Sequence, residues 1–216
     1  MSDLTIYSSI ITNLEGKLKE NNKLPGVEAH KKMAPPGRFS ENPTLYKPNK
    51  DTRVGSVLIL LYPDENNIVK FPLILRPEYD GVHSGQVALP GGKKDEEDVD
   101  LVAVALRETW EEIGVEVTRN EVIGQLSEIY IPPSNFLVYP TVAKLDHKPN
   151  FIPSPHEVAG LFEVSIDTLI DQSICKEKWV EFRGSQVLLP YFDINDNVVW
   201  GATAMILCEL KELLSQ

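Results

Sequence analysis

Three glutamates near the middle of the chain, Glu108, Glu111 and Glu112, are the side chains best suited to chemistry. They end an apolar stretch with helical periodicity, which predicts a helix over residues 99–113 that stops at Gly114. At about 100° per residue, the three carboxylates share a sector of about 100°. We therefore expect one helix side to present the acids and the opposite side to pack. The packing side is expected to hold Val99, Val102, Ala103, Leu106, Thr109, Trp110 and Ile113.

The negative charge of three carboxylates this close together needs compensation. Acids at i and i+4 repel each other, and the helix dipole disfavours anions near a helix C-terminus. Hard divalent cations that prefer oxygen ligands, Mg²⁺ or Mn²⁺, would supply it. Arg107 lies four residues before Glu111 and could hold that carboxylate, while Gly91 and Gly92 would let backbone approach a metal ion or a phosphate closely. The alternative is a solvated acidic helix face.

The stretch from Gly92 to Val115 resembles the signature of the Nudix hydrolases, which cleave a nucleoside diphosphate linked to another group with divalent metals. The residues that match its second half are Arg107-Glu108, Glu111-Glu112 and Gly114-Val115. Thr109 stands where that pattern has an aliphatic residue. In the first half, Asp98 replaces a glutamate, and the eight residues between it and Arg107 are one more than the general pattern has.

These two departures resemble one branch of the family, the coenzyme A diphosphatases. The residues that match this branch are Arg76, His83, Gly85, Val87, Pro90, Gly91, Gly92, Lys93, Asp95 and Asp98. The resemblance implies hydrolysis of coenzyme A or an acyl derivative to 4′-phosphopantetheine and adenosine 3′,5′-bisphosphate. The branch usually has Leu-Arg before its histidine, where this chain has Asp80-Gly81. ADP-ribose, NADH or another nucleotide therefore stays open as substrate, as does a non-catalytic nucleotide-binding module.

The resemblance also implies roles for single residues. The catalytic group is expected to be Glu108, Glu111, Glu112, Arg107 and Glu157. The ligands of Mg²⁺ or Mn²⁺ are expected to be Glu108, Glu111, Glu112 and the carbonyl of Gly92. The substrate-binding group is expected to be Arg76, His83, Gly91, Gly92 and Lys93.

Several of these residues have a second interpretation. Glu157 precedes a predicted strand and would act as general base or outer-shell metal ligand, or else as a solvated loop acid. His83 would read the substrate or order its loop, or be structural. Arg76 would contact phosphate or pair with an acid, and Lys93 would contact phosphate or only water.

Around this segment the chain predicts strands and helices without regular alternation. The resemblance implies an α/β (α+β) fold, a Nudix-type α/β/α sandwich with a mixed β-sheet and an N-terminal extension. We expect residues 1–50 to form a helix over 4–20 and an extended Pro-rich connection, and residues 51–216 to form the Nudix domain. The further expected strands are 56–62, 69–76, 124–131, 137–144, 158–164, 180–182, 186–193 and 198–200, and the further expected helices start at 166 and span 203–214.

Composition limits the partners. Thirty-two acidic and 21 basic residues give a net charge of −11, which argues against nucleic acid and against anionic membranes. Divalent cations would let such a chain bind a small nucleotide. Two cysteines without paired spacing, no signal peptide and no long apolar run predict a cytoplasmic protein. A homodimer is expected only because homodimers are the commonest oligomers.

Overall fold

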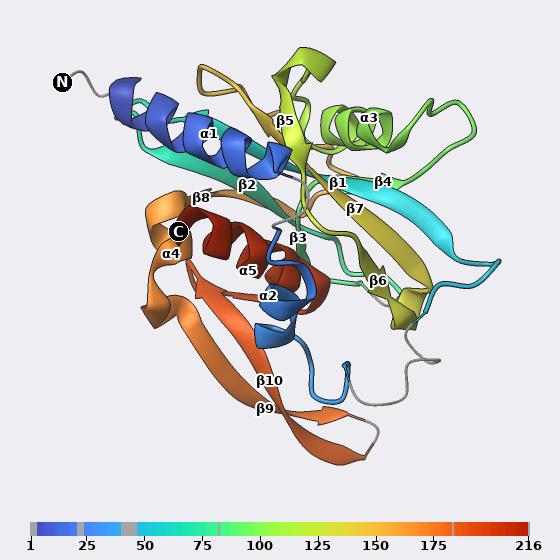
Figure 1. Cartoon of the computed structure of the whole chain (residues 1–216). Coiled ribbons are helices and arrows are strands. Elements are labelled where there is room, and N and C mark those ends of the chain that lie inside the picture. The colour runs from blue at the N-terminus through green and yellow to red at the C-terminus, as the bar shows by residue number, and fades with distance from the viewer. Residues whose placement is uncertain (1–3, 21–23, 40–46, 82, 183, 216) are drawn as a thin grey trace.

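A mixed sheet forms the centre of the molecule (Figure 1). The computed structural model describes residues 4–20, 24–39, 47–81, 83–182 and 184–215, and within them this sheet has eight strands. Its strands are β1 (Arg53–Pro63), β2 (Val69–Leu75), β3 (Val87–Ala88), β4 (Gly91–Lys93), β5 (Val122–Gln125), β6 (Ile129–Ile131), β7 (Phe136–Lys144) and β8 (Gly160–Ser165). The main path runs β3-β2-β1-β7-β5, with β4 beside β1, β6 beside β7 and β8 beside β2. β1 and β7 run parallel and the other pairs antiparallel, so the predicted mixed sheet is confirmed.

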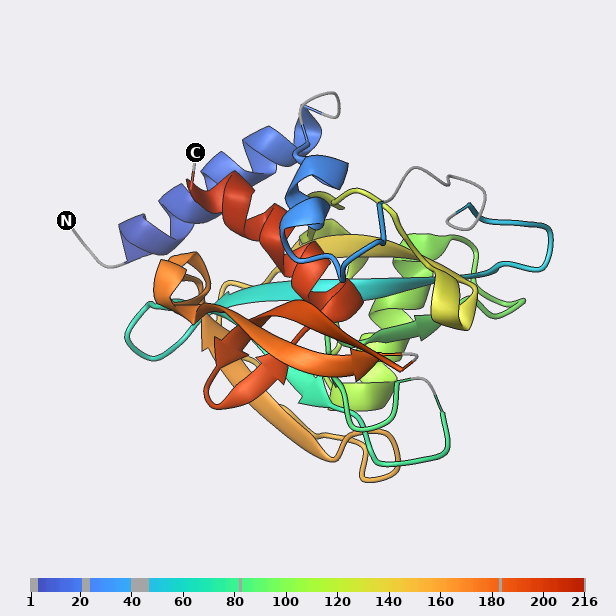
Figure 2. The same cartoon turned by 90° about the horizontal axis from the view of Figure 1, so that it is seen from below.

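Helices cover both faces of the sheet. Leu58, Leu60 and Tyr62 of β1 pack in one apolar cluster with α3 (Leu101–Ile113). The alternate residues Ile59 and Leu61 belong to a second cluster with α1 (Leu4–Lys19) and α5 (Gly201–Ser215). In Figure 2, α1 and α5 lie on one side of the cyan strand β1 and the green helix α3 lies on the other. This is the predicted α/β/α sandwich, and it explains why β1 is a continuous apolar run.

A smaller sheet follows the main one along the chain. It has the order β11-β10-β9, with β9 (Cys175–Phe182), β10 (Ser185–Ile194) and β11 (Asn197–Val199), and its β9–β10 hairpin projects away from the central sheet (Figure 1). The helix α4 (Ile166–Ile170) and the short 3₁₀ turn η4 (Gln172–Ile174) lead into it. Two further 3₁₀ turns, η2 (Arg119–Glu121) and η3 (Pro132–Ser134), connect elements of the main sheet.

The N-terminal extension departs from the prediction in one place. The stretch expected to be an extended connection contains the helix α2 (Gly26–Lys32), and the prediction of extended backbone there was wrong. The buried carboxylate of Glu209 in α5 accepts hydrogen bonds from the Gly26 N–H at 3.0 Å and from Ser127, and its Oε2 lies 3.0 Å from His30 Nε2. These contacts are tertiary, so no local periodicity announces α2.

The extension shares the core of the rest of the chain. Tyr7, Ile11, Leu14 and Leu18 of α1 are buried in the same cluster as β1 and α5. A domain boundary near residue 50 stays a prediction.

Two smaller differences concern strand bounds. The strand expected over 124–131 is divided into β5 and β6, and the loop expected over 77–92 contains β3 and the start of β4. Strand β3 is held by pairing with the longer strand β2, and β4 is held by pairing with the longer strand β1. Neither short strand has a residue pattern of its own that predicts a strand.

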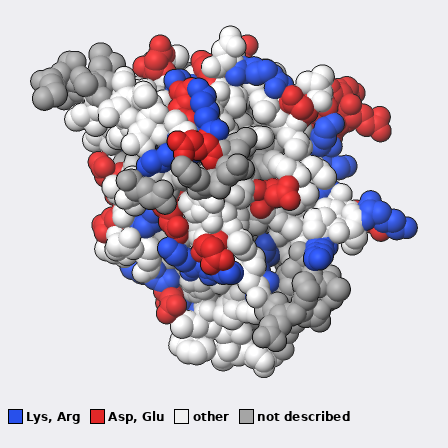
Figure 3. All heavy atoms as spheres, in the orientation of Figure 1, with Lys and Arg blue, Asp and Glu red and all other residues white. Residues whose placement is uncertain are grey.

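Acidic and basic side chains are interspersed over the face shown in Figure 3. This face therefore offers no basic stripe of the kind that binds nucleic-acid backbones. Among the helices of the described residues, none is both long enough and apolar enough to span a bilayer.

Candidate active site

The helix α3 begins and ends with two local signals. The side chain of Asp100 accepts a hydrogen bond from the Ala103 N–H at 2.9 Å, which caps the first turn. Gly114 ends the helix in the left-handed region, at φ 69°, and its N–H donates to the Trp110 carbonyl at 2.9 Å. The predicted end is confirmed, and the observed start is two residues later than predicted.

The face that α3 buries differs from the prediction. Glu112 is only 3% exposed, and the Glu108 side chain is 15% exposed. Trp110, by contrast, is 59% exposed, and Val99 is 83% exposed and precedes the helix. The expected packing side was therefore wrong at Val99 and Trp110, and the alternative of a fully solvated acidic face does not hold, because Glu108 and Glu112 point inward and only Glu111 faces solvent. The buried residues of the helix are Val104, Ala105, Thr109, Glu112 and Ile113.

The strand β4 receives the two inward acids. Glu112 Oε2 accepts a hydrogen bond from the Gly91 N–H at 2.8 Å. The Glu108 carboxylate lies against Gly92, where an added Cβ would come within 2.3 Å of Glu108 Cδ. Gly91 has φ +148°, and a Cβ there would lie 2.4 Å from the Ser56 carbonyl oxygen. The two glycines thus permit close packing of strand on helix, which a pattern of apolar residues does not predict.

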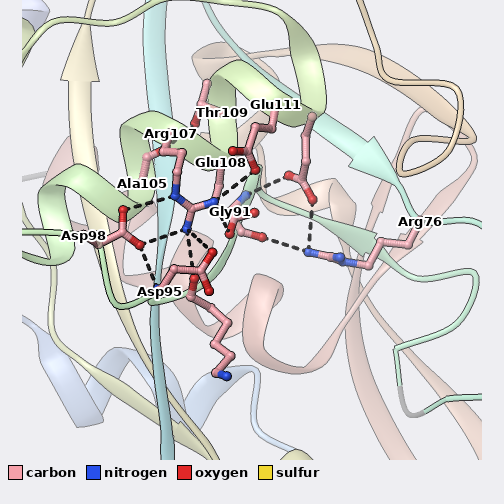
Figure 4. A network of polar contacts seen from close by, with 11 residues as sticks. Arg76, Gly91, Asp95, Asp98, Ala105, Arg107, Glu108, Thr109 and Glu111 are labelled. Atoms are coloured by element: carbon pink, nitrogen blue, oxygen red, sulfur yellow. Dashed lines mark hydrogen bonds and ion pairs between the residues drawn. The ribbon is translucent and has the colours of Figure 1, made fainter.

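Arg107 links the acids to the loop before the helix (Figure 4). Its Nε and Nη2 donate to the two Asp98 carboxylate oxygens at 3.1 and 2.9 Å, and Nη2 also donates to the Lys93 carbonyl at 3.1 Å. Its Nη1 lies 2.9 Å from Glu108 Oε1 and donates to Glu111 Oε2 at 3.0 Å, so the predicted contact with Glu111 is present. The Arg107 guanidinium lowers the pKa of Asp98. Asp98 therefore fixes Arg107, and Arg107 fixes two of the glutamates.

Arg76 contacts strand β4 from the side opposite Arg107 (Figure 4). Its Nη2 donates to the Gly91 carbonyl at 3.0 Å and lies 3.6 Å from Glu112 Oε1. Figure 4 shows Arg76 and Arg107 approaching the acids from opposite directions.

Negative charge at the site is only partly compensated. Burial, together with the charges of Glu108 and Glu157, raises the pKa of Glu112 to about 7, although Arg76 and the Gly91 N–H oppose this. Burial also raises the pKa of Glu108, with contributions from Glu111 and Glu157, against the effect of Arg107. A cation at this place would relieve both effects.

A hard cation suits these donors. Within the described ranges, no three His, Cys, Asp or Glu side chains are already grouped as a metal site. Three carboxylates and the Gly92 carbonyl are nevertheless oxygen ligands of the type that Mg²⁺ and Mn²⁺ prefer. The space beside Gly92 that a Cβ would fill holds the Glu108 carboxylate instead. These donors therefore fit a hard divalent cation. We call Gly91, Gly92, Arg107, Glu108, Glu111 and Glu112 the acid site.

Glu157 lies on a loop that is attached to the end of α3. The Ile152 N–H donates to the Ile113 carbonyl and the Ser154 N–H donates to the Glu112 carbonyl, both at 2.8 Å. These bonds satisfy carbonyls that a helix end leaves unpaired. Glu157 is exposed, and its charge raises the pKa of both inward acids.

A cavity of about 360 Å³ borders the other side of β4. All five predicted substrate-binding residues, Arg76, His83, Gly91, Gly92 and Lys93, line it. The structure brings them together, and their roles remain predictions. The His83 ring Nδ1 lies 3.2 Å from Gln86 Oε1, which ties the histidine to its own loop.

Other lining residues were not predicted. They include Arg38, Arg53, Phe136 and Trp200. One signal could have indicated a polar pocket wall. Side chains alternate between the two faces of a strand, so Arg53, Gly55 and Val57 share one face at the start of β1. Nothing in the Pro-rich stretch singles out Arg38. We call this cavity, with its basic residues Arg38, Arg53, Arg76 and Lys93, the basic pocket.

A family model of the NUDIX domain matches residues 52–182, which is more than half of the chain. The chain belongs to the Nudix hydrolase family. Nudix hydrolase 15, mitochondrial, of Arabidopsis thaliana is 32% identical to it over 175 residues, which cover 78% of this chain and 60% of that protein. The Nudix hydrolase NudL of Photorhabdus laumondii is 34% identical over 130 residues, or 60% of this chain and 69% of that one. This Nudix chain thus spans about three fifths of the Arabidopsis relative.

Two solved structures share the fold of this Nudix chain. A Nudix hydrolase from M. smegmatis, RenU, has a TM-score of 0.52 at 17% identity and covers 76% of this chain and 87% of its own. A MutT/nudix family protein from Enterococcus faecalis has a TM-score of 0.53 at 16% identity and covers 85% of this chain and 73% of its own. At these identities the likeness concerns the fold alone.

Proposed function

We propose that this Nudix chain is a metal-dependent diphosphatase whose preferred substrate is coenzyme A or an acyl-coenzyme A. One observation carries the proposal, namely that buried acids and a basic pocket lie on two sides of β4. Water adds across the diphosphate, and the bond between one phosphorus and the bridging oxygen breaks. The products are 4′-phosphopantetheine and adenosine 3′,5′-bisphosphate.

The acid site holds the metal in this proposal. Glu108, Glu111, Glu112 and the carbonyl of Gly92 would hold the ion, and Mg²⁺ or Mn²⁺ bound there would supply charge neutralisation of the phosphates and activation of a water molecule. Arg107 keeps two of the glutamates in position through its pair with Asp98. Phosphoryl transfer depends mainly on positioning and charge stabilisation, and a fixed network of this kind provides both.

The remaining predicted residues receive roles by their location. Glu157 accepts the proton of the attacking water or acts from the outer shell, since its charge is sensed by Glu108 and Glu112. Arg76 and Lys93 bind diphosphate oxygens at the mouth of the basic pocket, and His83 borders the same cavity.

ADP-ribose or NADH is the second candidate substrate. The observation that favours it is Asp80-Gly81, an exposed pair where the coenzyme A branch has Leu-Arg. A non-catalytic nucleotide-binding module is a third and weaker candidate, because all three metal-ligand glutamates are present.

We further propose a cytoplasmic homodimer with a small-molecule substrate. Cys175 and Cys208 are both free thiols, which suits a reducing compartment. Light scattering of the purified protein tests the dimer.

A substrate panel tests the proposed activity. Purified protein with Mg²⁺ or Mn²⁺ is given coenzyme A, dephospho-coenzyme A, ADP-ribose and NADH, and the products are separated by chromatography. We expect turnover of coenzyme A with both named products. Preferred cleavage of ADP-ribose or NADH would favour the second candidate. Absence of all turnover, with metal bound, would favour the binding module.

A further inference from the structure

The basic pocket is an exception in an acidic protein. The chain has 32 acidic residues against 21 basic ones. Among the described residues that line the pocket, four are Arg or Lys and none is Asp or Glu. Such a reversal of charge points to an anionic ligand.

The four cations fall into two groups. Arg76 and Lys93 are at the β4 end, where Arg76 donates to the Gly91 carbonyl. Arg38 and Arg53 are instead attached to β6 and to the turn that follows it, with Arg53 two residues along β1 from Gly55, the register partner of Lys93. Arg38 Nη2 donates to the carbonyl of Tyr130, and Arg53 Nη2 donates to that of Ser134 at 2.7 Å.

An apolar floor lies beside these two groups. Arg53 and Val57 are on the same face of β1, because side chains alternate along a strand. Phe136 and Val138 of β7 are opposite Arg53 and Gly55 in the parallel register. A ligand that fills the pocket therefore contacts apolar side chains as well as two sets of cations.

The chain keeps Arg53 oriented without neutralising it. Its guanidinium carbon lies 5.5 Å from the centre of the Phe136 ring, and within the described ranges no carboxylate lies in ion-pair distance of it. A guanidinium has five N–H donors, so the bond to Ser134 uses a minority of them.

Arg38 arrives from outside the matched Nudix region. It follows α2, which the buried contacts of Glu209 with Gly26 and His30 hold against α5. Pro35 lines the same pocket as Arg38. The N-terminal extension thus supplies part of the pocket wall.

We propose that Arg38 and Arg53 form a second anion subsite, which binds a phosphomonoester of the substrate separate from its diphosphate. The proposal rests on the proposed function, in that the diphosphate is taken to lie at the β4 end. Its substrate class is a nucleoside diphosphate derivative with one additional phosphate. The two arginines select that class, while Arg76 and Lys93 serve any diphosphate.

Substrate pairs that differ by one phosphomonoester test the subsite. The pairs are coenzyme A with dephospho-coenzyme A, and NADPH with NADH. We expect a higher kcat/KM for the phosphorylated member of at least one pair. Arg53→Gln and Arg38→Gln should each lower that preference at least about tenfold, because each removes a charged hydrogen bond to the phosphate. Arg53→Lys should retain part of it. Arg119→Gln is the control, since Arg119 is exposed, pairs with Asp100 and is absent from the pocket lining.

Equilibrium binding distinguishes a failure of the proposed activity from a failure of the anion subsite. Calorimetry with adenosine 3′,5′-bisphosphate and AMP needs no hydrolysis. If no diphosphate is cleaved but the bisphosphate binds more tightly than AMP, and Arg53→Gln removes that difference, the proposed activity fails and the subsite stands. If diphosphates are cleaved but neither variant changes the preference, the subsite is wrong and the activity stands. Equal losses for both members of each pair would show that the arginines only support the turn, and would also overturn the subsite.

Discussion

The acid site and the basic pocket lie on two sides of the same three-residue strand, β4. The acid site is built from one short stretch of chain between Gly91 and Glu112, and its members contact each other directly. The basic pocket draws its walls from segments as far apart as Pro35 and Ile206. One is local in sequence and the other is assembled by the whole fold.

In the two proposals above, this difference separates the region that does chemistry from the region that selects the substrate. The acid site depends mainly on contacts within its own segment, with Arg76 and Glu157 as outside contributors, whereas the basic pocket depends on helices and turns spread over the chain. Each test below therefore breaks one region and asks whether the other is affected.

The largest expected effect is that of Glu112→Gln on the acid site. The amide can still accept from the Gly91 N–H but loses the charge that ligates metal, so kcat should fall roughly a thousandfold. The melting temperature without metal should change little at pH 4.5, where folded Glu112 is protonated. Glu116→Gln, at an exposed position of the following segment, is the matched control. Turnover near that of the wild type in Glu112→Gln would remove this residue from the metal site.

Gly92→Ala should come next. Its Cβ would lie 2.3 Å from the Glu108 carboxyl carbon, so Glu108 must move and kcat should fall about a hundredfold. Gly160→Ala is the control, because a Cβ there meets Leu75 at an ordinary 3.5 Å. Steady-state kinetics with Mn²⁺ measures both variants. An unchanged kcat in Gly92→Ala would mean that the packing of Glu108 on β4 does not matter to the reaction.

The pH dependence of the free energy of unfolding tests the buried carboxyl group of Glu112 by itself. The folded pKa of Glu112 is about 7 against an ordinary value of 4.5, so this group stabilises the fold fully below pH 4.5 and loses that contribution as the pH rises through 7. In metal-free buffer, the free energy of unfolding of the wild type relative to Glu112→Gln should fall by about 3 kcal/mol over this range. Urea unfolding at several pH values measures the difference. A difference that stays constant with pH would contradict the raised pKa.

The smallest expected effect tests the remote support of the basic pocket. His30→Ala removes one of the contacts of the buried Glu209 carboxylate and loosens α2, at a cost of about 1–2 kcal/mol of stability. We expect KM to rise a few-fold while kcat stays within about twofold, since α2 supports Arg38 and not the acids. Lys31→Ala, an exposed neighbour, serves as control. A parallel fall of kcat would show that the two regions are not independent.

The same contrast explains what the sequence could predict. The helix that ends at Gly114 and the contact between Arg107 and Glu111 depend on near neighbours, and both are present, although the helix begins at Leu101 and not at Val99. The inward direction of Glu108 and Glu112 was missed because their partners are backbone groups of β4, which hydrophobic periodicity cannot register.

Long-range contacts account for the rest. Helix α2 exists because a carboxylate 183 residues away accepts the Gly26 N–H, and no local pattern contains that information. Arg38 contacts β6 and Arg53 contacts the turn after it, an arrangement that exists only after β1, β6 and β7 have paired. Residue types alone therefore indicated the acid site better than they indicated the walls of the basic pocket.

The two hydrogen bonds from Ile152 and Ser154 to the last carbonyls of α3 have a consequence for insertions. They join the loop of Glu157 directly to the helix of Glu112. The position of Glu157 relative to Glu112 therefore does not depend on the length of the chain between Val115 and Phe151. Added residues in the exposed turn that contains Asp146 and His147 should leave the separation of Glu157 and Glu112 unchanged. That turn is thus a suitable place to graft a tag or a reporter domain onto a working enzyme.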